Sequence, residues 1–137
     1  MTRIMISMLV CGAAALGSPA KAEEAGELFK ERCGACHLGP ERADDRVAPP
    51  IFAVKNHYSG RHSGEAAFVE AMTNHLVGKG EILMPGAVRR FGKMPDQELT
   101  LDEARQLAEF VFNEDFAEPE WFADHYRQEH GEAPKAN

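Results

Sequence analysis

Hydrophobic positions recur at helical spacing along most of the chain, and no segment shows the sustained alternation of a half-buried strand. The pattern predicts amphipathic helices over residues 24–33, 63–77, 100–113 and 119–129. Glycines 78 and 80 are expected to end the second helix, and Thr100 begins a capping box that opens the third. We therefore expect an all-α fold.

Two segments show no clear period. Residues 38–62 and 81–99 contain glycine, proline and mixed charges, so we expect a long loop in the first and mostly loop in the second. The polar tail from Gly131 is expected to fray.

The first 22 residues have the layout of a secretory signal peptide. Arg3 supplies a positive charge, an uncharged apolar stretch runs from Ile4 to Leu16, and an A-x-A pattern ends at Ala22. We expect cleavage after Ala22 and export to the periplasm. The alternative is an uncleaved N-terminal anchor, although the 13 apolar residues are few for a membrane span.

Length and charge narrow the possible functions. A chain of 137 residues that is 44% hydrophobic is sufficient for one domain. The formal net charge is −7, and removal of Arg3 and Lys21 with the signal segment leaves 13 basic and 22 acidic side chains, a net charge of −9. Such a chain is a poor candidate for binding nucleic acid or an anionic membrane. We expect a monomer without a permanent membrane span, which docks to partners that carry a basic patch.

The main chemical motif is Cys33-Gly34-Ala35-Cys36-His37, the C-x-x-C-H attachment signature of c-type haem. The two thiols would add across the porphyrin vinyl groups, and His37 would ligate the iron from one side. A thioredoxin-type redox pair would need a preceding strand, and a structural zinc site would need a second pair of ligands. A plain disulfide between Cys33 and Cys36 is the third alternative.

A second motif carries a resemblance to a known family. Met94-Pro95 is followed by a helix that begins at Thr100 and contains Glu103-Ala104, Leu107-Ala108 and Phe110-Val111. Together with the C-x-x-C-H motif at the end of a helix, this arrangement resembles the class I c-type cytochromes, over residues 24–113. The resemblance implies a cytochrome c fold, in which N- and C-terminal helices cross over one covalently attached haem c. Together with the signal-peptide pattern (1–22), it divides the chain into a cytochrome domain (23–113) and an extension (114–137).

The resemblance also implies roles for individual residues. Met94 corresponds to the sixth iron ligand, with Met84, a histidine or no ligand as alternatives. The carbonyl of Pro49, or else of Pro50, would accept a hydrogen bond from the His37 imidazole. Gly26 and Phe29 would lie where the helices cross, with Phe29 against Leu107, Phe110 or Val111. Candidate pocket-lining residues, for which ordinary core packing is the alternative, are Ile51, Phe52, Phe68 and Phe91; His57, His62 and His75 are expected at the surface or in loops.

These features predict a one-electron carrier rather than an enzyme. Two filled axial positions would leave no site for substrate at the iron. Two alternatives remain open. One is an electron-entry subunit of a periplasmic oxidoreductase, and the other is a haem enzyme or gas sensor in which the sixth ligand is absent. The extension, with its aromatic residues at helical spacing, is expected to form an extra helix over the core or a docking surface.

Overall fold

The computed structural model describes residues 19–39 and 45–133, and every regular element within these residues is helical. The all-α class is therefore confirmed for the described part of the chain. Residues 1–18, on which most of the signal-peptide prediction depends, lie outside it. The elements are α1 (Pro19–Phe29), the π-helix η1 (Lys30–Gly34), α2 (Ala35–His37), α3 (Ile51–Arg61), α4 (Glu65–Leu76), α5 (Pro85–Phe91), α6 (Leu101–Asn113) and α7 (Glu120–His130).

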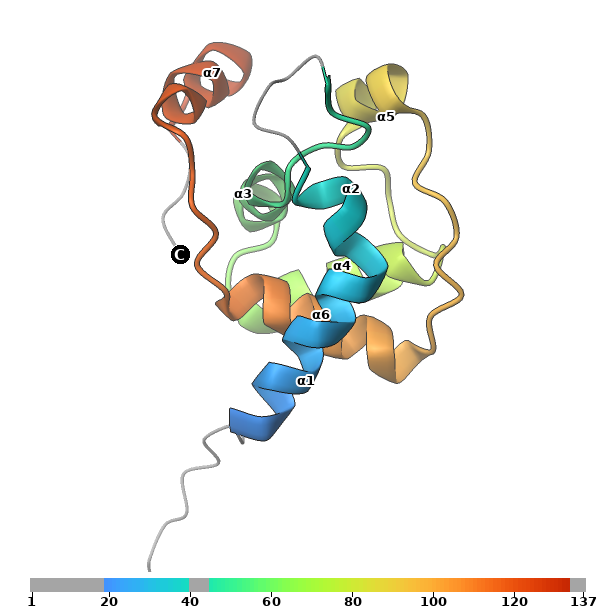
Figure 1. The fold of residues 1–137 in the computed structure, drawn as a ribbon. Helices are drawn as coiled ribbons and strands as arrows, with labels where there is room; N and C mark the ends of the chain where they lie inside the picture. Colours follow the sequence, from blue (N-terminus) through green and yellow to red (C-terminus); the bar gives the residue numbers. More distant parts are fainter. Residues whose placement is uncertain (1–18, 40–44, 134–137) are drawn as a thin grey trace, which may run out of the picture.

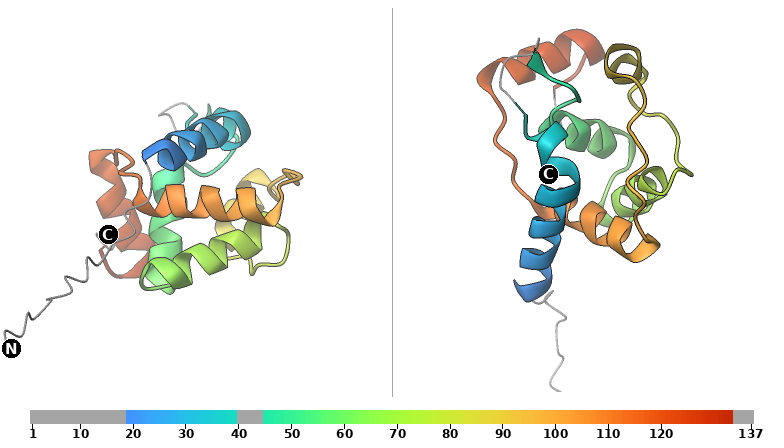
Figure 2. Two further views of the ribbon diagram at one scale, coloured as in Figure 1. Left: turned by 90° about the horizontal axis from the view of Figure 1, so that it is seen from below. Right: turned by 45° about the vertical axis from the view of Figure 1, so that its right-hand side comes forward.

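Helix α6 is the centre of the fold and lies between α1 and α4 (Figure 2, left). Its buried face consists of Ala104, Leu107, Ala108 and Val111. The capping box predicted at its start is present: Thr100 Oγ1 accepts the Glu103 N–H, and the Glu103 carboxylate accepts the Thr100 N–H at 2.8 Å. The helix spans the residues that the hydrophobic pattern and the capping box predicted, apart from the N-cap itself.

Helix α1 crosses α6 at Gly26 (Figure 1). A Cβ at Gly26 would lie 3.3 Å from Phe110 Cε2, so a larger residue there would push the helices apart. Phe29 is buried beside this point, with its ring centroid 5.3 Å from that of Phe110. The expected close approach of these two helices, and the aromatic contact beside it, are therefore confirmed.

Helix α4 provides the other side of the core and is close to its expected bounds. Phe68 and Met72 are buried in the main cluster, and Val69 and Leu76 are half-buried. The residue at its N-cap is Gly64, with φ 83°, and not Ser63 as expected. Only glycine adopts this conformation without strain, which explains why the helix begins one residue later.

The long loop expected over residues 38–62 is wrong in its second half, where α3 runs from Ile51 to Arg61. Pro50 is its N-cap, and Ile51, Phe52 and Tyr58 are buried. Ile51 and Tyr58 are seven residues apart, the spacing of two helical turns. The polar residues and glycine between Asn56 and Gly60 obscured this spacing in the sequence.

A short helix, α5, also interrupts the segment expected to be mostly loop over residues 81–99. Pro85 is its first residue, where the missing N–H costs nothing. Gly92 follows its last turn with φ 82°, outside the helical region, in a conformation that favours glycine. Proline and glycine therefore mark the two ends of a helix here.

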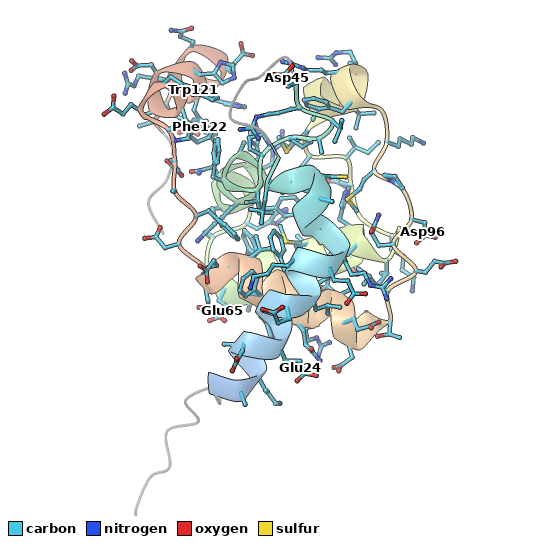
Figure 3. The ribbon with its side chains drawn as sticks, in the orientation of Figure 1. Glu24, Asp45, Glu65, Asp96, Trp121 and Phe122 are labelled. Carbon is cyan, nitrogen blue, oxygen red and sulfur yellow. The ribbon has the colours of Figure 1, made fainter. Side chains whose placement is uncertain are left out.

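The extension forms α7, which packs against α3 (Figure 1). Pro119 is the N-cap rather than the first helical residue, so the helix is shifted by one position from its expected start. Phe122 lies between α7 and α3 (Figure 3), with its ring centroid 4.7 Å from that of Phe52. The expected extra helix is therefore present, packed on α3 through a second cluster of buried residues, and the alternative of a docking surface stays a prediction. None of the described helices has the length and apolar character needed to cross a membrane.

Candidate functional site

The C-x-x-C-H motif lies at the end of the first helical stretch, where α1 continues through η1 into α2. Cys33 falls in the π-helical turn, and Cys36 and His37 fall in α2. A π-turn holds one more residue than an α-turn, so it shifts the helical register of the residues that follow. Such turns are frequent at functional sites.

The two cysteines of the motif are free thiols in different surroundings. Cys33 is half-buried against the main core cluster, whereas Cys36 is exposed. The pKa of the Cys33 thiol is raised to about 11, chiefly by burial and in smaller part by the nearby Cys36, while Arg32 opposes the shift. Cys33 is therefore held as a neutral thiol at neutral pH.

The imidazole of His37 is fixed by a hydrogen bond to the backbone on the far side of the loop. Its Nδ1 lies 2.7 Å from the carbonyl oxygen of Pro49, 12 residues further along the chain. A carbonyl oxygen can only accept, so Nδ1 carries the proton and Nε2 carries the lone pair. Of the two prolines proposed for this role, Pro49 makes the contact and Pro50 instead caps α3.

Burial lowers the pKa of His37, and the hydrogen bond to Pro49 partly opposes this shift. The ring is therefore neutral at physiological pH, and its Nε2 lone pair is available to a metal ion. Within residues 19–39 and 45–133, no group of three or more His, Cys, Asp or Glu side chains is arranged to hold a metal ion.

The two candidate methionines lie at either end of the α5 region. Met84 is half-buried and is the N-cap residue of α5. Met94 follows α5 in the irregular segment 92–100, where Asp96 marks the edge of the molecule (Figure 3), and is 39% exposed. Neither methionine is joined to His37 by a hydrogen bond or other polar contact among the described residues. The choice between them stays a prediction.

The hydrophobic residues proposed to line a pocket belong to different parts of the fold. Ile51 and Phe68 belong to the main core, whereas Phe52 is buried in a second cluster with Phe122 and Tyr126. Phe91 is half-buried at the end of α5, where the Arg90 guanidinium carbon lies 5.1 Å from its ring centroid. The proposed contact of Phe52 and Phe91 with a haem stays a prediction.

Sequence reasoning missed the contacts that join α3 to the extension. Asn56 Nδ2 donates to Glu118 Oε1 at 2.5 Å, and Lys55 Nζ donates to the carbonyl of Glu114 at 2.7 Å. His57, expected at the surface or in a loop, is half-buried in α3 with its ring centroid 4.7 Å from that of His130. Because α3 was expected to be a loop, nothing in the sequence pointed to these partners.

Comparison with known proteins adds no identification. No family model, no curated protein and no solved structure matches the chain.

Proposed function

We propose that the protein is a monohaem c-type cytochrome that carries one electron at a time. The observation that carries this proposal is the His37–Pro49 hydrogen bond, which orients an imidazole directly after two free thiols on one helical segment. A backbone carbonyl behind a ligating histidine fixes the ring and increases its basicity. The C-x-x-C-H motif and the resemblance to class I cytochromes point to the same chemistry.

The donor groups fit a covalently attached haem. Cys33 and Cys36 would form the two thioethers, His37 Nε2 would be one axial ligand, and Met94 is the proposed second one. Haem bound in this way would supply one iron centre that accepts and releases a single electron.

The charge distribution suggests how such a carrier would meet its partners. Residues 114–124 contain five acidic and no basic side chains, whereas residues 82–95 contain three basic and no acidic ones. A partner with a basic patch, which we propose from the overall acidity, would meet the acidic stretch through a small, salt-sensitive interface. We propose a monomer in the periplasm, in line with the signal-peptide pattern.

The test begins with co-expression of the chain and a haem-attachment system, followed by denaturation and extraction of non-covalent haem. We expect wild-type protein to retain haem and the Cys33→Ser/Cys36→Ser double variant to lose it. Ala35→Ser is the matched control, since this exposed residue lies between the two cysteines and its change leaves both thiols and His37 in place. Wild-type protein without covalent haem would contradict the proposal and return Cys33 and Cys36 to thiol chemistry.

The electron-carrier role needs a separate measurement on the haem-loaded protein. Absorption spectra of the oxidised and reduced forms should show sharp low-spin bands, and the oxidised form the weak far-red band of a Met–Fe(III) bond. Carbon monoxide should leave the reduced spectrum unchanged. A high-spin spectrum, or a shift with carbon monoxide, would instead favour a haem enzyme or gas sensor.

A further inference from the structure

The segment 114–130, here called the C-terminal clamp, lies along most of α3. Two hydrogen bonds attach its linker: Lys55 Nζ to the Glu114 carbonyl at 2.7 Å, and Asn56 Nδ2 to Glu118 Oε1 at 2.5 Å. The Asn56 side chain is buried, and its Nδ2 also donates to the Phe52 carbonyl. A buried amide with both N–H groups engaged favours one geometry for the linker on α3.

Aromatic side chains attach the helix of the clamp. The Phe122 ring meets the Phe52 ring edge to face at 4.7 Å, and the Tyr126 ring lies 5.4 Å from that of His57. At the far end of α3, a Cβ at Gly60 would lie 3.1 Å from the Tyr126 hydroxyl oxygen. The clamp thus contacts α3 from its first turn to its last.

The first turn of α3 follows directly in the chain after Pro49, the hydrogen-bond partner of His37. Phe52 lies in this turn, and Pro50 is the N-cap, whose carbonyl accepts the Ala53 N–H at 3.0 Å. The preceding residue is Pro49, which accepts the hydrogen bond from His37. Because two consecutive prolines restrict the backbone here, we expect a displacement of the first turn to move the Pro49 carbonyl as well.

Because the buried residues form two clusters, the effect of the C-terminal clamp on the Pro49 carbonyl can be measured separately from the stability of the main core. Ile51 and Tyr58 anchor α3 in the main cluster with α4 and α6, whereas Phe52 belongs to the second cluster with Phe122 and Tyr126. A change at Phe122 removes a contact of the second cluster and leaves the main cluster complete.

We propose that the C-terminal clamp positions the Pro49 carbonyl against His37, with Phe122 and Glu118 as the positioning residues. The expected change in haem potential rests on the proposed function. The expected change in the His37 hydrogen bond does not. A weaker hydrogen bond makes the imidazole less basic, and a less basic ligand stabilises Fe(III) less. Loss of the clamp therefore raises the midpoint potential.

The test uses the full-length protein with Phe122→Ala and Glu118→Ala, each paired with a conservative variant, Phe122→Leu and Glu118→Gln. Arg127→Ala is the control on the same helix, because its ion pair with Asp124 is exposed and stays within α7. Two properties are measured: the midpoint potential of the haem, and the exchange of the His37 Nδ1 proton with solvent by NMR of the reduced protein.

We expect the two alanine variants to raise the potential and to speed the Nδ1 proton exchange by about five- to tenfold, as for loss of one hydrogen bond. The conservative variants and Arg127→Ala should stay near wild type. The proposal would be overturned if the alanine variants had the same midpoint potential and the same Nδ1 proton exchange rate as Arg127→Ala. If Phe122→Ala fails to fold, Glu118→Ala alone decides the test. If the chain binds no haem, the proposed function has failed. Exchange of the His37 Nδ1 proton in the haem-free protein then still shows whether the C-terminal clamp positions the Pro49 carbonyl.

Discussion

His37 Nδ1 and the Pro49 carbonyl oxygen lie 2.7 Å apart and join two segments that are separated by 12 residues. The contact closes the loop that follows the C-x-x-C-H motif. It also fixes which imidazole nitrogen carries the proton, since the carbonyl can only accept. A histidine prepared in this way differs from one on an open surface, because both its ring orientation and its tautomer are set before any ligand binds.

The choice of sixth ligand can be tested with two matched variants. We expect Met94→Ala to open the iron to carbon monoxide in the reduced state, with loss of the far-red band in the oxidised state. Met84→Ala removes the same side chain at the N-cap of α5 and should retain wild-type spectra. Carbon monoxide binding by Met84→Ala but not by Met94→Ala would reverse the assignment.

Much of the helical framework could be predicted from the sequence. Helix α6 combines a capping box with apolar residues at regular spacing, and its bounds were predicted closely. Helix α3 was missed because its buried residues pack in two different places. Ile51 and Tyr58 belong to the main core, whereas Phe52 packs against α7. A helix buried on two sides has no single apolar stripe, so its hydrophobic periodicity is weak.

The candidate site could likewise be predicted only in part from the sequence. The motif residues and Pro49 could be identified from local sequence and the family resemblance, because their spacing along the chain is short. The contacts of Asn56 with Glu118 and of His57 with His130 join residues more than 60 positions apart. Such contacts depend on the tertiary arrangement, and no local pattern indicates them.

The two thiols should differ in reactivity before haem is attached. At pH 8, a thiol with a pKa of about 11, as at Cys33, is thiolate in about one molecule in a thousand, so alkylation should be slow. Cys36 is exposed and should react much faster. Timed alkylation with iodoacetamide, followed by peptide mass spectrometry, measures both rates in the haem-free chain. Equal rates at the two cysteines would show that Cys33 is not buried as described.

The crossing of α1 and α6 requires a small residue at position 26. We expect Gly26→Leu to destabilise the protein by about 1–3 kcal/mol, the usual cost of overpacking, because the new side chain meets the Phe110 ring. Phe110→Ala creates space at the same point, so the double variant should lose less stability than the sum of the two single changes. Denaturant unfolding of the four proteins measures this coupling, and strictly additive losses would argue against the contact.

The attachment of α7 to α3 should depend on pH through His57. Burial lowers the pKa of His57, the hydrogen bond to Ala53 opposes the shift, and the nearby His130, Arg61 and His125 lower the pKa further. The other aromatic group against His57 is Tyr126, whose pKa is raised by burial and by Glu132, so it stays neutral in the acidic range.

A folded-state pKa below the ordinary imidazole value of about 6.5 means that the undocked state binds more protons as the pH falls. The docked state therefore has its full stability above about pH 6.5 and loses stability as the pH falls below that value. Hydrogen exchange of the backbone amides of residues 120–130, corrected for intrinsic exchange rates, should show less protection at pH 5.5 than at pH 7.5. His57→Gln cannot gain a proton and should remove most of this difference. Equal protection of the wild-type helix at the two pH values would contradict the predicted pH dependence. An unchanged difference in His57→Gln would show that a group other than His57 causes it.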